Sequence, residues 1–129
     1  TIKSAKDLQG KVVGVQIGTT YMEAAQKIPG IKQVRTYQKD PDALQDLLAG
    51  RLDAWITDRF VAKEAIKERK LENTLQLGEL VFQEKVAMAV AKGNKSVLDA
   101  LNGALAELMK DGTYAQISKK WFGEDVRCR

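Results

Sequence analysis

The sequence of 129 residues contains no histidine and a single cysteine, Cys128. Histidine is the usual general base and a common metal ligand, so its absence excludes histidine-based catalysis and histidine metal sites. One cysteine cannot form a disulfide within the chain and supplies no cluster of thiolates for zinc. We therefore expect no metal site and no cofactor, and no spacing of Asp and Glu residues calls for a catalytic carboxylate pair.

Long apolar runs and a one-sided charge are also missing. No apolar stretch reaches the roughly 20 residues that cross a membrane. No basic segment followed by an apolar one opens the chain, so we expect any export signal to have been removed or to lie outside this sequence. The 21 Lys and Arg residues are interspersed with 17 Asp and Glu residues, for a net charge of +4. Without a basic stripe that is interleaved with aromatic residues, we expect no nucleic-acid partner.

The composition that remains, 44% apolar and 29% charged, is typical of a globular protein with room for one core. Along the first 83 residues, stretches with strand and helix character alternate. The predicted strands are residues 12–16, 33–37, 53–57 and 74–77, and the predicted helices begin near Thr20, Asp40 and Asp58, the last two as caps. This alternation predicts an α/β fold in which βαβ units form a mainly parallel sheet.

The pattern changes after Glu84. Residues 86–90 are a short apolar run that predicts one more strand, and two amphipathic helices follow it. The first of these helices carries Val97, Leu101 and Leu105 on one side.

The turn Gly18-Thr19-Thr20 joins the first predicted strand to the helix that follows it. Glycine permits a tight turn, and backbone N–H groups at a helix start lack partners within the helix. With the threonine hydroxyls and the positive end of the helix dipole, they favour an anion such as a carboxylate or phosphate. Thr20 and Glu23 have the spacing of a capping box, which places the helix start at about Thr20. The alternative is an ordinary strand–helix connection without a ligand.

A second turn, Thr57-Asp58-Arg59, follows a later predicted strand. In open α/β sheets ligands bind beyond the carboxyl ends of the strands, and both turns lie there. Asp58 is predicted to cap the third helix or to hold a cation such as an ammonium group, and one carboxylate can do both. Gln16 ends its strand and either hydrogen-bonds a ligand side chain or is solvated. An anion-holding turn beside a carboxylate that holds an ammonium group describes a site for a zwitterion, of which an α-amino acid is the commonest.

The chain resembles the periplasmic solute-binding proteins of ABC importers for polar amino acids, the bacterial family 3 group with the type II binding-protein fold. The segments that carry the resemblance follow the family's order: residues 7–16, 18–20, 43–54, 57–59, 90–94, 110–114 and 120–123. The resemblance implies two lobes and a hinge that the chain crosses twice, with residues 1–83 in lobe two. Residues 84–129 would then be the returning hinge strand and the C-terminal helices of lobe one. We expect a fragment that lacks the N-terminal part of lobe one.

The resemblance also implies roles for individual residues. Gly18, Thr19 and Thr20 fall on the family's turn for the ligand α-carboxylate. Asp58 falls on its aspartate for the α-ammonium group, and Gln16 on a residue that often contacts the ligand side chain. The implied protein is not an enzyme: by hinge closure it binds a polar or cationic amino acid, or cystine, and it delivers this ligand to an ABC permease. Its place is the periplasm, or the cell exterior with a lipid anchor.

An enzyme on the same scaffold, such as a cyclohexadienyl-dehydratase-like lyase, is the alternative function. Asp58 beside the Gly18-Thr19-Thr20 turn favours the binding protein, because an α-amino site needs that carboxylate. Residues 86–90 and the helix after them are shaped to cover lobe one. We therefore expect the chain to self-associate through its C-terminal segment, or its C-terminal helices to fold back onto their own lobe.

Overall fold

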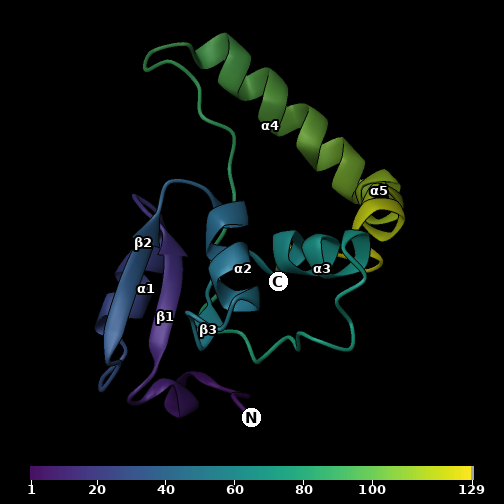
Figure 1. Cartoon of the computed structure of the whole chain (residues 1–129). Helices are drawn as coiled ribbons and strands as arrows, with labels where there is room; N and C mark the ends of the chain where they lie inside the picture. Colours follow the sequence, from purple (N-terminus) through teal and green to yellow (C-terminus); the bar gives the residue numbers. More distant parts are fainter. Residues whose placement is uncertain (129) are drawn as a thin grey trace. The chain divides into compact units, whose positions relative to one another are not determined.

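The computed structural model describes residues 1–128, and the chain separates into two compact units, Thr1–Gln83 and Glu84–Arg129. Figure 1 labels the elements of both units. The division falls where the sequence pattern changes. The assignment of the two units to the two lobes of a longer protein stays a prediction.

The first unit is built on a sheet of three parallel strands, in the order β2-β1-β3. The central strand is β1 (Val12–Gln16), and β2 (Gln33–Tyr37) and the two-residue β3 (Ala54–Trp55) pair with its two edges. β1 is an apolar run because it is covered on both faces, and Val13 and Val15 are fully buried. The predicted α/β fold with a parallel sheet is confirmed.

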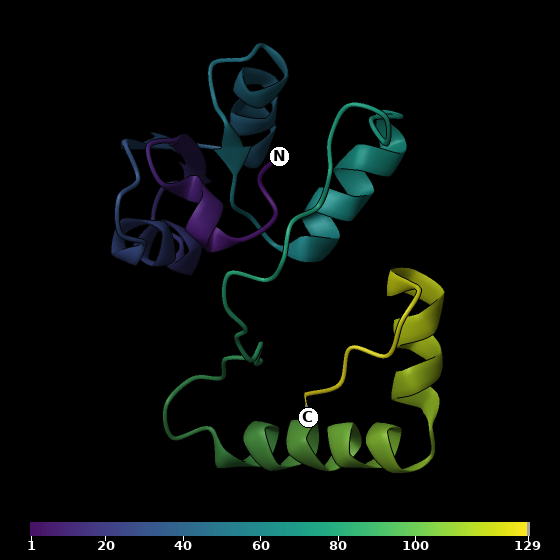
Figure 2. The ribbon, with the colours of Figure 1, turned by 90° about the horizontal axis from the view of Figure 1, so that it is seen from below.

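Helices cover both faces of this sheet: α1 (Thr20–Lys27) lies on one and α2 (Asp40–Leu48) on the other (Figures 1 and 2). Val13 and Val15 point to the α1 face, where they pack in one core cluster with Ala25 and Ile56. Gly14 points to the α2 face, and a methyl group there would collide with Leu52. A short 3-10 helix, η1 (Ala5–Leu8), precedes β1, and α3 (Arg59–Glu68) follows β3.

Two strands that the sequence predicts are missing from the structure. Residues 74–77 and 86–90 are irregular, so the expected C-terminal strand of the second unit is a wrong prediction. A β-strand exists only where a neighbouring strand takes up its backbone hydrogen bonds, and no strand among residues 1–128 pairs with either segment. Val86 is 92% exposed as a result. An apolar run by itself does not form a strand.

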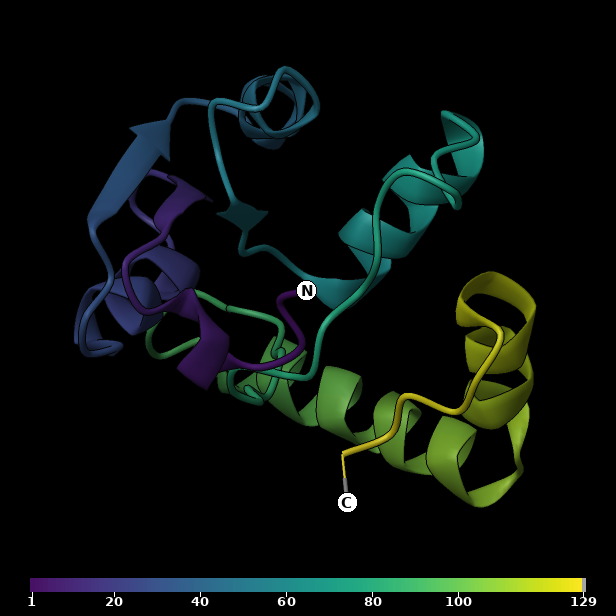
Figure 3. The same cartoon turned by 60° about the horizontal axis from the view of Figure 1, so that its bottom comes forward.

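The second unit contains two helices, as predicted: α4 (Lys95–Lys110) and α5 (Thr113–Phe122). α5 turns sharply away from α4 (Figures 2 and 3) at Gly112, whose φ of +84° is a left-handed conformation that glycine adopts without strain. α4 is amphipathic, yet none of its residues is buried. Among residues 1–128, no helix has both the length and the apolar character that crossing a bilayer requires.

Candidate functional site

Both sequence-predicted turns lie at the carboxyl edge of the sheet, after two strands that are direct neighbours. The turn Gly18-Thr19-Thr20 follows β1, and the turn Thr57-Asp58-Arg59 follows β3, which pairs with β1. From β1 the chain passes to β2 on one side, and it then returns past β1 to β3 on the other. The boundary between β1 and β3 is therefore the topological switch point of the sheet, the place where open α/β sheets bind their ligands.

The first turn is held by Thr19, which occupies the N-cap position of α1. Its hydroxyl oxygen accepts a hydrogen bond from the Met22 N–H at 3.2 Å, and its O–H donates to the Gln16 carbonyl at 2.7 Å. The helix begins at Thr20 as predicted, but the predicted capping box of Thr20 and Glu23 is wrong, because the extended backbone of Thr19 makes it the cap. Gly18 has a φ of +73°, and a methyl group built on it would meet no atom within 4 Å, so the conformation is what requires glycine.

The second turn places Asp58 at the N-cap of α3. One carboxylate oxygen, Oδ1, accepts hydrogen bonds from the Phe60 N–H at 2.8 Å and the Val61 N–H at 3.1 Å. The other oxygen, Oδ2, accepts none from residues 1–128, and the side chain is half-buried. The capping role that the sequence suggests is thus present, and it leaves one oxygen of the carboxylate for a ligand. Whether this oxygen binds an ammonium group stays a prediction.

Asp40 contributes to this edge of the sheet in a way that sequence reasoning missed. It was expected to cap α2, but Lys39 occupies the N-cap position and Asp40 is the first helical residue. The Asp40 carboxylate reaches β3 instead: Oδ1 accepts from Trp55 Nε1 at 3.0 Å and Oδ2 accepts from the Thr57 hydroxyl at 3.0 Å. These partners lie 15 and 17 residues away, so no local pattern could reveal them.

Gln16 also makes a contact across the sheet edge. Its side-chain N–H group, Nε2, donates to the backbone carbonyl of Gln38 at 3.2 Å, in the loop that joins β2 to α2. The side chain is therefore not simply solvated. Contact with a ligand side chain stays a prediction.

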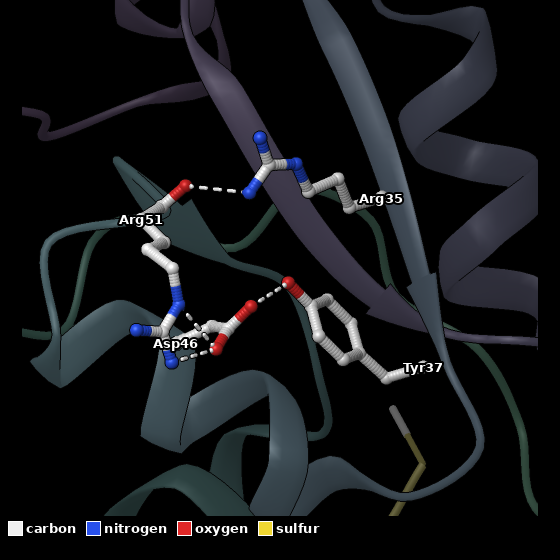
Figure 4. A network of polar contacts seen from close by, with 4 residues as sticks. All are labelled: Arg35, Tyr37, Asp46 and Arg51. Carbon is white, nitrogen blue, oxygen red and sulfur yellow. Dashed lines mark hydrogen bonds and ion pairs between the residues drawn. The ribbon is translucent and has the colours of Figure 1, made fainter.

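On the sheet face that α2 covers, a network of four residues connects β2 to α2 and to the loop after it (Figure 4). Asp46 accepts from the Tyr37 hydroxyl at 2.7 Å and from Arg51 Nε at 2.8 Å, and Arg35 donates to the Arg51 carbonyl at 3.1 Å. The hydrogen bonds from Arg51 and Tyr37 hold the pKa of Asp46 below its ordinary value. Burial, and then the Asp46 carboxylate, raise the pKa of Tyr37. No local sequence pattern indicates this network, since its members are up to 16 residues apart.

The profile of the bacterial extracellular solute-binding proteins, family 3, matches residues 3–124. The chain belongs to this family. Among the family's members, L-cystine-binding protein TcyJ of Escherichia coli K12 is 47% identical over 128 residues, which cover 98% of this chain and 47% of TcyJ. This chain thus spans about half the length of the curated relatives that it matches.

Solved structures of amino-acid-binding proteins share the fold of this family 3 chain. An ancestral arginine-binding protein bound to glutamine superposes with a TM-score of 0.80 at 42% identity, over 95% of this chain and 55% of that one. The predicted type II binding-protein lobe is therefore confirmed. An ancestral amino acid-binding protein described as a precursor of cyclohexadienyl dehydratase gives a TM-score of 0.75 at 35% identity, over 94% of this chain and 51% of that one. This structure too is named for amino-acid binding, so the enzyme alternative is not favoured.

Proposed function

We propose that this chain is the ligand-binding lobe two of an amino-acid receptor that serves an ABC importer, and that it is not an enzyme. The observation that supports this proposal is the pair of turns after β1 and β3. A helix N-terminus with two threonines and a carboxylate with one unoccupied oxygen lie side by side at the switch point of the sheet. Their chemistry matches the two charged groups of an α-amino acid.

In this proposal the ligand carboxylate binds at Gly18-Thr19-Thr20, and its ammonium group binds Asp58 Oδ2. The Thr19 hydroxyl would have to turn its proton from the Gln16 carbonyl to the ligand, while it keeps its bond to the helix backbone. Asp58 needs no such exchange, because Oδ1 alone carries its capping bonds. Gln16 contacts the ligand side chain after it releases Gln38.

The family supports the rest of this proposal. The ligand bridges two lobes and stabilises the closed state, and an ABC permease then receives it. Residues 84–129 contribute to lobe one. We propose a polar or cationic amino acid, or cystine, as ligand, and a place outside the cytoplasm, in the periplasm or on a lipid anchor at the cell surface. Relatives named for cystine and arginine support this class of ligand.

Isothermal titration calorimetry on the two-lobe protein that contains this chain tests the proposal. L-cystine, L-arginine, L-histidine and L-glutamine are titrated in turn, and we expect at least one of them to bind with a micromolar Kd or better. A parallel assay follows dehydration of a cyclohexadienyl acid. Turnover of that acid without binding of any of the four amino acids would overturn the proposal in favour of the enzyme.

A further inference from the structure

Asp40 spans the end of the central strand. It follows β2, and its two hydrogen-bond donors, Trp55 Nε1 and the Thr57 hydroxyl, belong to β3 or follow it, on the other side of β1. Both carboxylate oxygens are used, each at 3.0 Å. Thr57 directly precedes Asp58, so Asp40 is bonded to the residue next to the predicted ammonium-binding carboxylate.

Residues 57–58 have few hydrogen bonds to the sheet. β3 is two residues long, and its ladder with β1 ends where the Ile56 N–H donates to the Gly14 carbonyl. Within residues 1–128, the bond from Thr57 to Asp40 is the only hydrogen bond that joins residues 57–58 to an element other than α3. The bond to Asp40 therefore restrains residues 57–58 relative to the sheet.

The loop that precedes Asp40 contacts the end of β1, next to the other turn. Its Gln38 carbonyl accepts from Gln16 at the end of β1, and the Gln16 carbonyl accepts from Thr19. Residues 38–40 are thus bonded to the chain beside both predicted ligand-binding turns. A single loop can set the separation between an anion site and a carboxylate, and an amino acid binds only if that separation fits its two charged groups.

We infer that Asp40 is a positioning residue of the amino-acid site, which fixes the Thr57–Asp58 turn relative to the β1 turn without touching the ligand. This inference rests on the proposed function for its ligand. It predicts a specific order among variants. Asp40→Ala breaks both bonds and releases the turn. Asp40→Asn can keep both, because its amide oxygen accepts from the Trp55 indole and its NH₂ group donates to the Thr57 hydroxyl, which also accepts.

Calorimetry on the two-lobe protein, with the four amino acids named above as probes, separates positioning from other roles. We expect Asp40→Ala to weaken binding about tenfold. The released turn would no longer orient Asp58 toward the ligand, and the loss of one oriented hydrogen bond corresponds to about this factor. The Kd of Asp40→Asn should stay within about twofold of the wild-type Kd, a much smaller change than the one expected for Asp40→Ala. Asp42→Ala is the matched control, since Asp42 is exposed in the same first turn of α2 and its side chain has no hydrogen bond among residues 1–128. If Asn weakens binding as much as Ala, the charge of Asp40 acts directly and the inference is wrong; unchanged binding by Asp40→Ala overturns it as well.

A measurement without ligand keeps this inference separate from the proposed function. In ¹H–¹⁵N spectra of the 129-residue chain, Asp40→Ala should shift the Trp55 indole resonance and also the amides of Phe60 and Val61, which bind Asp58 Oδ1. Asp42→Ala should leave all three unchanged. Unshifted Phe60 and Val61 amides in Asp40→Ala would overturn the positioning role even if the wild type binds amino acids. If the wild type binds none, the proposed function fails, and these amides still decide whether Asp40 holds the turn.

Discussion

Replacing Asp58 by asparagine separates its observed capping role from its proposed ligand role. The cap uses Oδ1 alone, which accepts from the Phe60 and Val61 N–H groups. An asparagine oxygen can accept the same two bonds, and asparagine is as good an N-cap as aspartate. The second oxygen, which accepts no hydrogen bond from residues 1–128, becomes an NH₂ group. The substitution therefore preserves α3 and removes the acceptor that we assign to the ligand ammonium group.

The expected loss of affinity follows from the bond that is removed. A hydrogen bond between charged groups contributes about 1.5–3 kcal/mol, which corresponds to a Kd raised roughly 10- to 150-fold. The NH₂ group would also face the ammonium group with a donor, so this range is a lower bound. The unfolding free energy should change by only a few tenths of a kcal/mol. Asp58→Ala, by contrast, should lose the affinity and also about 0.5–2 kcal/mol of stability with the cap.

Calorimetry for affinity and urea unfolding for stability, both on the two-lobe protein, check this prediction. Asp42→Asn is the control, since it removes one negative charge from a nearby helix start and no hydrogen bond among residues 1–128. An Asp58→Asn variant that binds as tightly as the wild type would refute the reasoning, and Asp58 would then be a helix cap only.

Four other predictions test the turn, the sheet and the isolated chain. Thr19→Val removes a cap acceptor, so we expect a loss of about 1 kcal/mol in urea unfolding and a weaker preference for an amino acid over its amide, whereas Thr19→Ser should retain both. Asp46→Asn should destabilise the chain at neutral pH, because Arg51 lowers the pKa of Asp46. A lowered pKa contributes stability that is present above about pH 4 and is lost as the pH falls through the folded-state pKa, so a stability difference that persists in acid would contradict this. Gly14→Ala should cost about 1–3 kcal/mol by collision with Leu52, and the double variant with Leu52→Ala should lose less than the sum of the single losses. The 129-residue chain alone should bind amino acids with a Kd of about 1 mM or weaker, and it should sediment as a dimer or larger, since α4 has no buried residue; micromolar binding or a strictly monomeric chain would speak against these two expectations.

Local patterns were enough to predict most helix starts and the two turns. The start of α1 agrees with the prediction, and α3 begins one residue after its predicted cap, Asp58. α2 begins at Asp40 itself, one residue before the start that an Asp40 cap implies. The prediction of the capping residues was less accurate. Thr19 caps α1 in place of Thr20, and Asp40 is not a cap but accepts a hydrogen bond from Trp55 in β3. A shift of one residue changes neither the apolar pattern nor the composition, so only the backbone conformation decides which side chain caps.

By itself, the sequence determined that this protein is an α/β lobe with a threonine turn and an aspartate turn, each of which follows a buried strand. These features depend on residues that are close in the chain, where periodicity and turn chemistry act. Only the tertiary structure decided that β1 and β3 are neighbours, that Asp40 bonds Thr57 across the end of β1, and that Asp46 joins Tyr37 to Arg51. It also decided that residues 86–90 form no strand. Each of these outcomes depends on which distant groups come within hydrogen-bond distance, and that depends on the packing of the whole unit and not on any local pattern.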